Sequence, residues 1–526
     1  MKNLFRTITL SCLVAVIPAQ TWAEGAEPSE KLTVLSQSST STLYSFNYPT
    51  VNNAGESVVL SSALIAWTPE DRQNSDSIES IHIYSHATIG ANEECPTSLG
   101  FSKEQSMLTI LPRREFKDYS TSITANYVGH CIIIAPDYEG YGVTKNLPHP
   151  YLAQRLTAQQ VLDAYNYGIE LYRKQAADKS AGNPLLPIKS DWRLFTFGFS
   201  QGAAVTLALQ RMIEEKELSE QLHYYGSICG DGPYDLIETM RYYFYDDGTS
   251  YDVQTDHRKG FSTYPVVVPL IFNGMCATNS EVSHYKIEDF LSQQLLDTGV
   301  LDWIASKEYT TSDMAKMWYD QLQDGLDAHG RHYTPEQMAE MFTSPREDKV
   351  AGKMNKMLTQ ATYDYLNDPD KMAAVPAVAT NAQEALHRAL AENSVATGWN
   401  PQHRIQFYHS RSDMVVPYGN YLAFQEAHKD GLNEKYRIND TFAPDCDHMD
   451  AAVVFFINFI GGGGNFAADY NWISEGSTPT AIDITSADVR PQQPDSNWYT
   501  LDGRKLTDKP TQPGIYILNK KKVLVK

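Results

Sequence analysis

Hydrophobic and polar positions alternate along the first part of the chain. Residues 32–67 show this pattern, for example in SVVLSSALIAW, and the polar stretch Asn52–Gly55 divides them into two runs. Alternation with a period of two is typical of strands, and a glycine-containing break between two such runs predicts a turn. The sequence therefore predicts a sheet that opens with antiparallel strands.

The next hydrophobic runs are typical of a parallel sheet. Strand-like runs occupy residues 80–90 (SIHIYSHATIG), 131–142 (CIIIAPDYEGYG) and 193–199 (RLFTFGF). Between the last two, residues 155–175 place apolar side chains at helical spacing. Strands that alternate with helices predict the α/β class, with a mostly parallel sheet and helices on both of its faces.

The pattern changes after residue 264, because helical periodicity continues without strand-like runs. Residues 265–394 are rich in methionine and aromatic residues, and Thr334–Gln337 forms a capping box with proline at the first helical position. We expect an inserted helical cap that contains no strand. Its larger apolar side chains fit the core of the cap or, less often, an acyl pocket: Met314, Met317, Trp318, Met338, Met341 and Phe342.

Strand and helix signals return after the cap. A strand is predicted in RIQFYHSRSD, a helix in DAAVVFFINFIGG, and a flexible break at Gly461–Gly464. The predicted core therefore has two parts, residues 31–264 and 395–464. Residues 481–526 contain short strands, Asp-Gly turns and many lysines, which predict a separate small β module.

Composition and charge restrict the function. The chain has 526 residues, of which 42% are apolar, so it can bury a large core. Its formal net charge of −21 argues against nucleic-acid binding, which requires a positive surface. The sequence gives no prediction of the oligomeric state.

The N-terminus is typical of an exported protein. Lys2 and Arg6 precede an apolar run, and a cleavage site of small residues follows, which predicts a signal peptide over residues 1–23 that is cleaved after Ala23. A lipoprotein anchor at Cys12 is a weaker alternative, since this cysteine lies inside the apolar run. We expect the mature protein in the periplasm, at the cell surface or outside the cell.

The cysteines and histidines do not form a metal-binding pattern. Five cysteines remain after Cys12 is removed, so at least one thiol stays unpaired even if disulfides form after export. No CxxC or HExxH motif occurs. The sequence therefore predicts neither a metal nor a cofactor.

The clearest chemical signal is a serine between two glycines. Gly198-Phe199-Ser200-Gln201-Gly202 joins a predicted strand to a predicted helix. This G-x-S-x-G pattern is the nucleophile elbow, in which small residues permit a sharp turn that exposes the serine. The alternative is an ordinary glycine-rich turn, but a strand before the serine and a helix after it favour a catalytic nucleophile.

A serine nucleophile needs a histidine base and an acid, which follow it in chain order in proteins with this elbow. Asp413 follows a predicted strand, and His448 precedes an apolar helix. We predict the triad Ser200, Asp413 and His448, with turn and helix-start roles as the alternatives for the last two. Three carboxylates near the histidine are rival acids: Asp445, Asp447 and Asp450.

Backbone N–H groups should stabilise the oxyanion that forms on the substrate. The N–H of Gln201 is the first candidate, because it follows the nucleophile at the start of a helix. The second should come from the loop that follows YSHATIG, where Thr88 is the first choice and Ala87 the second. The alternative is an ordinary strand end.

Several motifs resemble the secretory lipase family of α/β-hydrolases. They are GFSQGA, IAPDYEGYG, HPYL, GDGPYDL, HSRSDMVVP and DHMDAA, and the likeness covers residues 44–460. The resemblance implies an α/β-hydrolase fold with a helical cap, carboxylic ester hydrolysis, and a disulfide between Cys95 and Cys276. Ala87 departs from the glycine that is usual in the family, and the cap is long.

The tail resembles C-terminal β modules of exported Bacteroidetes proteins, through YTLDGRKL, GIYILN and KKVLVK. This resemblance implies a role in secretion or in attachment to the cell surface.

The sequence thus predicts a secreted serine hydrolase that cleaves small-molecule or lipid esters, a lipase or an esterase. One alternative is a serine peptidase of the prolyl type. Such enzymes carry a large propeller ahead of the hydrolase, and the segment between Ala23 and Tyr44 is too short for one. The other alternative is a surface-binding protein without catalysis, which the complete triad disfavours.

Overall fold

A computed structural model describes most of the chain. The described residues are 26–37, 41–67, 76–98, 131–178, 185–323, 332–346, 349–429, 434–460, 465–476, 498–499, 505–506, 514–518 and 521–525. The predicted signal peptide and the predicted break at Gly461–Gly464 lie outside them. The chain divides into two compact units, Met1–Ser477 and Thr478–Lys526.

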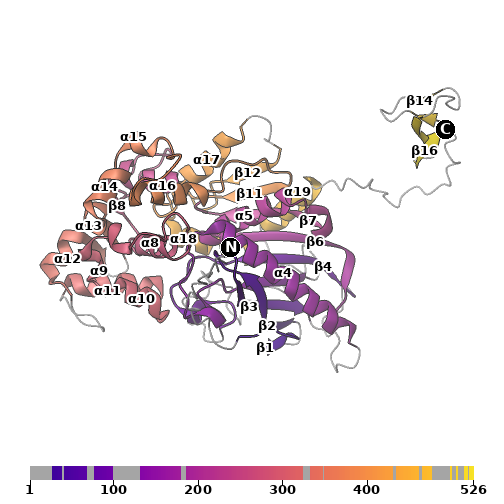
Figure 1. Ribbon diagram of the computed structural model, residues 1–526, viewed down its shortest axis with the longest axis horizontal. Helices are drawn as coiled ribbons and strands as arrows, with labels where there is room; N and C mark the ends of the chain where they lie inside the picture. The colour runs from indigo at the N-terminus through magenta and orange to yellow at the C-terminus, as the bar shows by residue number, and fades with distance from the viewer. Residues whose placement is uncertain are drawn as a thin grey trace, which may run out of the picture. The chain divides into compact units, whose positions relative to one another are not determined.

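A nine-stranded sheet forms the centre of the first unit (Figure 1). From edge to edge its strands are β1 (Thr33–Gln37), β2 (Ser41–Val51), β3 (Ser57–Trp67), β5 (Cys131–Pro136), β4 (Ile78–Ser85), β6 (Ile188–Phe199), β7 (Tyr224–Gly230), β11 (Arg404–Tyr408) and β12 (Tyr436–Asn439). Pairing is antiparallel from β1 through β5 and parallel from β5 through β12. The predicted antiparallel opening and parallel remainder are confirmed.

Helices cover both faces of this sheet. One face packs against α4 (Gln154–Ala177), α5 (Gln201–Glu215) and α17 (Gly419–Ala427), and the other against α18 (His448–Ile460) and α19 (Asn465–Gly476).

The central strand β6 shows how the two faces are built. Leu194 joins the core under α5, whereas its neighbour Phe195 joins the core under α18 and α19. Successive side chains of a strand point to opposite faces, so an apolar run without alternation fills two cores at once. The predicted helices on both faces are confirmed, and α19 adds a helix after residue 464.

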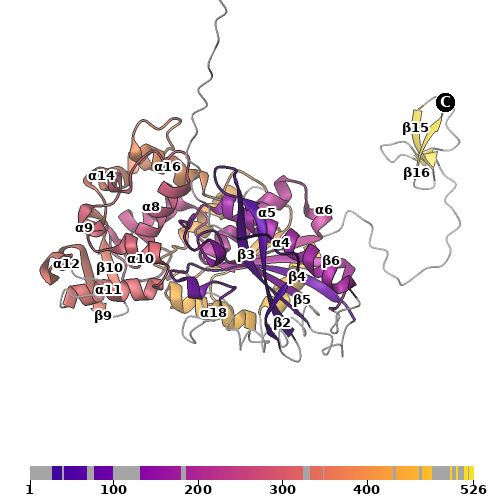
Figure 2. The same cartoon turned by 60° about the horizontal axis from the view of Figure 1, so that its bottom comes forward.

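The segment between β7 and β11 forms a mainly helical cap with its own hydrophobic core, which lies beside the sheet (Figures 1 and 2). Its helices are α7 (Leu236–Tyr245), α8 (Val267–Thr278), α9 (Gln293–Leu296), α10 (Val300–Ser306), α11 (Thr311–Gln323), α12 (Pro335–Met341), α13 (Met354–Met357), α14 (Gln360–Leu366), α15 (Pro369–Met372) and α16 (Ala382–Glu392). Thr334 and Gln337 form the predicted capping box at the start of α12. The cap methionines and aromatics named above all belong to this core.

The expectation that the cap contains no strand is wrong. A three-stranded antiparallel sheet joins β8 (Phe261–Ser262), β10 (Lys349–Lys353) and β9 (Phe342–Arg346). These strands have two to five residues, and β9 contains Pro345 while β10 contains Gly352. Such short strands with strand-breaking residues leave no period-two pattern to detect.

Shorter elements complete the first unit. They are α6 (Ser219–Leu222) and the 3₁₀ turns η1 (Asn92–Glu94), η3 (Gly142–Thr144) and η4 (Ile287–Asp289). Among the described residues, no helix is both long enough and apolar enough to cross a bilayer.

The second unit is a small antiparallel sheet. Its strands are β14 (Lys505–Leu506), β13 (Trp498–Tyr499), β15 (Gly514–Leu518) and β16 (Lys521–Val525), in this spatial order. The short strands expected in the tail are therefore present.

The disulfide implied by the family resemblance is not formed. Cys95 and Cys276 are both free thiols. Cys95 is buried in a small cluster with Ile89 and Tyr141, whereas Cys276 packs on the core of the cap. Each sulfur therefore lies in a different apolar cluster, and the expected pairing is wrong.

Candidate active site

Ser200 sits at a sharp corner between β6 and α5. Its backbone has φ 56° and ψ −126°, a conformation that non-glycine residues rarely adopt. The Ser200 N–H donates a hydrogen bond of 2.8 Å to the carbonyl oxygen of Gly230 on the adjacent strand β7. The corner is thus fixed by the sheet, and it stores local strain of the kind that clusters at functional sites.

The two glycines of the elbow are required by space. A Cβ atom on Gly198 would collide with the carbonyl group of Gly202, and a Cβ atom on Gly202 would collide with the carbonyl oxygen of Ser85. The start of α5 therefore packs directly on the end of β4. Only glycine permits this close approach, so the spacing seen in the sequence has a steric cause.

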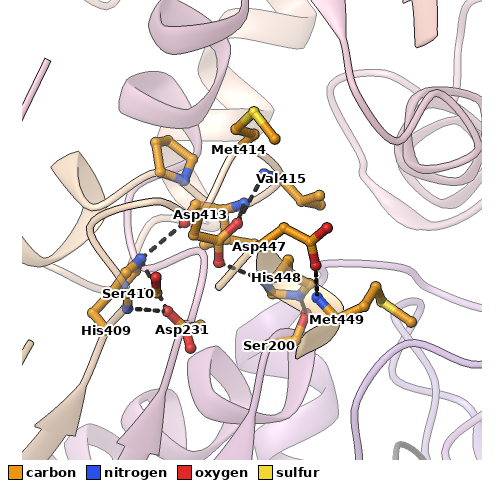
Figure 3. Close-up of polar contacts among 12 residues, drawn as sticks. Ser200, Asp231, His409, Ser410, Asp413, Met414, Val415, Asp447, His448 and Met449 are labelled. Atoms are coloured by element: carbon orange, nitrogen blue, oxygen red, sulfur yellow. Dashed lines mark hydrogen bonds and ion pairs between the residues drawn. The ribbon is translucent and has the colours of Figure 1, made fainter. Parts of the chain in front are cut away.

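The three residues of the predicted triad lie in hydrogen-bonding order (Figure 3). The Ser200 hydroxyl lies 2.8 Å from Nε2 of His448, and Nδ1 of His448 lies 2.5 Å from Oδ2 of Asp413. All three side chains are buried, with exposed fractions of 7%, 5% and 1%. When Nδ1 carries its proton and donates it in the hydrogen bond to the carboxylate, Nε2 can accept the proton of the serine hydroxyl.

Backbone groups hold the carboxylate of Asp413 in place. Its Oδ1 accepts hydrogen bonds of 2.8 Å from the N–H groups of Val415 and Val416, in the turn that follows β11. This leaves Oδ2 for the imidazole of His448. One oxygen of Asp413 therefore stabilises the turn, which was the alternative role considered for this residue, and the other oxygen contacts the histidine.

The rival acids occupy other positions. Asp447 accepts hydrogen bonds from the N–H groups of Met449 and Asp450, and so caps the start of α18 (Figure 3). Asp445 and Asp450 are exposed. Of the four carboxylates that the sequence offered, the structure brings Asp413 to the imidazole.

The loop after β4 reaches the same cavity as Ser200, and Ala87 and Thr88 both line it. The Ala87 carbonyl oxygen lies 2.7 Å from Nδ1 of His86. In a trans peptide the C=O and the following N–H point in opposite directions, so this contact fixes the direction of the Thr88 N–H. Within the described chain, neither this N–H nor that of Gln201 donates to another residue.

His149 supports the elbow, and the sequence reading did not assign it this role. Its Nε2 lies 2.9 Å from the Gln201 side-chain nitrogen, and its Nδ1 lies 2.7 Å from the Glu139 carbonyl oxygen. Burial lowers the pKa of His149 to about 3, so the ring stays neutral and can accept from Gln201. The only signal in the sequence was the PHPYL motif, which carries no chemistry by itself.

A second buried carboxyl group adjoins the triad. Asp231 follows β7, and its Oδ1 accepts a hydrogen bond of 2.7 Å from the Ser410 N–H. One ligand atom each from Asp231, His409 and Asp413 lie within 4.8 Å of one another. Burial first, and the charge of Asp413 second, raise the pKa of Asp231 well above its usual value. The charged form of Asp231 is therefore disfavoured at this position.

These three residues are a poor cation site, although their donor atoms are of a suitable type. Both oxygens of Asp413 already serve the Val415–Val416 amides and His448. His409 directs its Nε2 to the Val416 carbonyl oxygen at 2.8 Å. A metal ion would compete with the contacts that order the triad.

A cavity of about 110 Å³ opens beside Ser200 and His448. Core residues form one wall, among them Ala87, Thr88, Phe199 and Met449. Cap residues form the other wall, among them Tyr264, Val267, Ile271 and Thr310–Ser312. None of the cap methionines considered for an acyl pocket lines it, so within the described residues they serve the core of the cap instead.

Known structures share this architecture. No protein-family model matches the chain, and a comparison with curated protein sequences finds no relative. The rice cell wall degrading esterase LipA from Xanthomonas oryzae matches with a TM-score of 0.53 at 17% identity, over 80% of this chain and 88% of LipA. A Legionella pneumophila protein matches with a TM-score of 0.53 at 15% identity, over 86% of this chain and 92% of its own.

These likenesses extend over most of both chains, and at such low identity they concern the fold. Together with the mixed sheet and its helices on both faces, they show that the chain has the α/β-hydrolase fold with an inserted cap. The fold expected from the motif resemblance is confirmed.

Proposed function

We propose that this α/β-hydrolase is a serine ester hydrolase that cleaves short-chain carboxylic esters through an acyl-enzyme. The observation that carries the proposal is the hydrogen-bonded series from Ser200 through His448 to Asp413, at a strained elbow beside a cavity. The LipA neighbour is an esterase, and the shared fold places this activity first among those the site can perform.

The geometry gives each residue a step. The Ser200 oxygen attacks the ester carbonyl carbon while His448 takes its proton, and the imidazolium then protonates the departing alcohol. Asp413 keeps the imidazole in the tautomer that has a free Nε2 and stabilises its positive charge. A water molecule, activated by the same imidazole, then releases the acid and restores the serine hydroxyl.

The negative oxygen of the tetrahedral intermediate needs hydrogen-bond donors that are already in place. We assign this role to the N–H groups of Gln201 and Thr88, with Ala87 as the neighbouring alternative. The contacts of His86 and His149 support this assignment, because they hold the Ala87 carbonyl and the Gln201 side chain.

The cavity favours small acyl groups. Its volume of about 110 Å³ is somewhat smaller than the roughly 150 Å³ of an engineered protein cavity that accommodates benzene. A long fatty acyl chain does not fit such a space, so acetyl to butyryl esters are the expected substrates and an esterase is favoured over a lipase.

The test is a series of p-nitrophenyl esters from acetate to palmitate, together with labelling by a fluorophosphonate probe. We expect turnover that is highest for acetate to butyrate, and one labelled serine. Ser200→Ala should abolish both, while Ser412→Ala, a control serine whose hydroxyl bonds to the Pro444 carbonyl, should keep both. Ester turnover that survives in Ser200→Ala would refute the proposal.

Two other outcomes would favour the alternative functions. Release of dipeptides from peptides without ester turnover would favour a serine peptidase. Absence of both probe labelling and turnover in a folded protein would favour a binding protein without catalysis.

We propose in addition that the protein is exported and that residues 481–526 attach it to the cell surface or guide its secretion. The signal-peptide pattern that ends at Ala23 and the separate small β-sheet support this proposal. The mature protein should begin at Glu24 by N-terminal mass spectrometry. Truncation after residue 480 should release it from the cell surface without loss of esterase activity in the enzyme assay.

A further inference from the structure

Glu94 places a carboxylate in the wall of the catalytic cavity. It ends the 3₁₀ turn η1, in the loop that also carries Ala87 and Thr88, and its side chain is 5% exposed. Its Oε2 accepts hydrogen bonds of 2.8 and 2.9 Å from the N–H groups of Gly90 and Ala91. Its Oε1 has no hydrogen-bond partner among the described residues, so this oxygen is the one available to a ligand.

The hydroxyl groups around the cavity are engaged with one another. The Tyr264 hydroxyl donates to Oγ1 of Thr311 at 2.6 Å, and the Thr88 and Tyr151 hydroxyls lie 2.9 Å apart. The mechanism proposed above uses Ser200, His448 and backbone amides, and leaves Glu94 without a task. Glu94 is therefore a polar group of the cavity whose function is unassigned.

The cavity beside Glu94 does not supply a positive charge, and the buried Lys307 behind the turn places its Nζ over the Tyr141 ring instead. None of the described residues that line the cavity is a lysine or an arginine. Burial, followed by the nearby charges of Asp313 and Glu93, raises the pKa of Glu94 to about 7. An enclosed carboxylate without a counter-ion is costly, and a cationic ligand would offset this cost.

The aromatic side chains of the cavity fit the same kind of ligand. Tyr151 and Tyr264 both line it, and tyrosine rings attract cations through their π faces. A carboxylate together with tyrosine rings is a suitable environment for an ammonium group. A neutral alkyl group would leave the charge of Glu94 unpaired.

We propose that Glu94 is a specificity residue that selects esters carrying a cationic ammonium group, and that it binds this group in the same cavity in which Ser200 attacks the ester. The inference rests on the proposed function, since it names the substrate class of that site. The ammonium group makes and breaks no bond; it is held by Glu94 while the ester is hydrolysed as described above.

The test uses pairs of esters with equal shape and different charge. Acetylcholine and 3,3-dimethylbutyl acetate place the charge in the alcohol, while ethyl 4-(trimethylammonio)butyrate and ethyl 5,5-dimethylhexanoate place it in the acyl group. We expect the natural enzyme to prefer the cationic member of at least one pair by about tenfold or more in kcat/KM. Glu94→Gln should reduce this preference about tenfold.

The variant is chosen to keep the loop intact. The side-chain oxygen of glutamine can still accept from the Gly90 and Ala91 amides, so Glu94→Gln removes the charge and keeps these hydrogen bonds. Glu93→Gln is the matched control, because it removes a negative charge from an exposed position of the same turn. It should leave the preference unchanged.

A second measurement tests the proposal through its pH dependence. The trimethylammonium charge is independent of pH, so the preference should fall as the pH decreases from 8 to 6 and Glu94 takes up a proton. The titratable groups around Glu94 are Glu93 in its own turn, Asp313 on α11 and the hydroxyls of Tyr141 and Tyr264. Lys307 also packs against this turn, and burial lowers its pKa to about 8, so Glu94→Gln serves as the control in which the preference should not fall between pH 8 and 6.

The outcomes separate this inference from the proposed function. Equal hydrolysis of both members of each pair, or a preference that Glu94→Gln leaves unchanged, overturns the inference while ester hydrolysis stands. If neither member of any pair nor any p-nitrophenyl ester is hydrolysed, the proposed function fails and the inference fails with it.

Discussion

The two walls of the catalytic cavity are built in different ways. The core wall includes residues that follow strands of the sheet, such as Ser200 after β6 and Val415 and Val416 after β11, and the N–H groups of these two valines hold Asp413. The cap wall consists of residues such as Tyr264 and Thr311, which are positioned by packing within the cap. In our proposal the core wall carries out the reaction and also supplies Glu94, whereas the cap wall limits the size and shape of the ester that fits.

The largest expected effect is on the core wall. His448→Ala removes the base that accepts the serine proton, so kcat/KM for p-nitrophenyl acetate should fall on the order of 10⁵-fold or more. A stopped-time assay at high enzyme concentration measures this loss. The far-ultraviolet circular dichroism spectrum of the variant should match that of the natural protein, which shows that the variant is folded. A loss below about tenfold would remove His448 from the mechanism.

A somewhat smaller loss should follow from a change behind the histidine. Asp413→Asn keeps the shape of the side chain but favours the wrong tautomer of His448, and kcat should fall about 10⁴-fold. Asp447→Asn is the matched control, because Asp447 caps α18 through the N–H groups of Met449 and Asp450, whereas Asp413 binds Nδ1 of the imidazole. If the control loses as much activity as Asp413→Asn, the choice between these acids is wrong.

A change in the core of the cap should affect stability. Trp318 is fully buried and stacks on Phe342 with ring centroids 4.7 Å apart, so Trp318→Ala should cost about 3–5 kcal/mol of unfolding free energy. Denaturant titration measures the loss. Below the unfolding transition, labelling of Ser200 by a fluorophosphonate should persist, because the sheet holds the triad. Loss of labelling in a folded variant would show that the two walls depend on each other.

The pH dependence of stability should report on a buried histidine of the core. Burial, helped by the charge of Arg193, lowers the pKa of His82 to about 3 in the folded state, against 6.5 in the unfolded chain. The unfolded state therefore binds a proton below pH 6.5 that the folded state does not bind. As the pH falls below 6.5, the unfolding free energy of the natural protein should decrease by about 1.4 kcal/mol per pH unit relative to that of His82→Leu.

Unfolding free energies at pH 7, 5.5 and 4.5 test this difference, with the exposed His284→Gln as the control. The control should show no such trend relative to the natural protein. If the difference in unfolding free energy between the natural protein and His82→Leu stayed the same at all three pH values, His82 would take up its proton in the folded state as well.

The smallest expected effect concerns the cap wall. Thr311→Val removes the hydroxyl that accepts from Tyr264, and a neutral hydrogen bond is worth roughly 1 kcal/mol, so activity on p-nitrophenyl acetate should change by less than about tenfold. Larger changes are expected in the ranking of esters, which a comparison of acetate with butyrate measures. A loss as large as that in Asp413→Asn would contradict the division of labour between the walls.

The sequence was informative for the core wall, because its residues are marked by local patterns. The elbow around Ser200 contains two glycines, because a larger side chain would collide with neighbouring backbone. Asp413 follows strand β11, and His448 begins helix α18. The order of strands and helices then brings them together. The α/β class followed from the alternation of strands and helices, and the resemblance of the motifs implied the α/β-hydrolase fold.

The cap wall and the supporting contacts could not be predicted in this way. His149 contacts Gln201 across the fold and Glu94 reaches the cavity through a loop, and apart from the PHPYL motif, which carries no chemistry by itself, nothing near them in the sequence indicates these positions. The short strands β9 and β10 were missed because they lack periodicity, and the pairing of Cys95 with Cys276 was wrong because their two clusters are separate. These features depend on tertiary packing rather than on local pattern.

The cap begins and ends on neighbouring strands. β7 and β11 are adjacent and parallel in the sheet, and the Asp231 N–H after β7 donates to the Tyr408 carbonyl at the end of β11. The chain leaves the sheet at the carboxyl end of β7 and re-enters at the amino end of β11, but the N–H groups of Val395 and Ala396 donate to the Tyr234 carbonyl oxygen, so the cap segment between them begins and ends at almost the same place. A cap attached in this manner can become longer or shorter, or be exchanged, during evolution without displacing the residues on the sheet. The same catalytic residues can then act on new substrates.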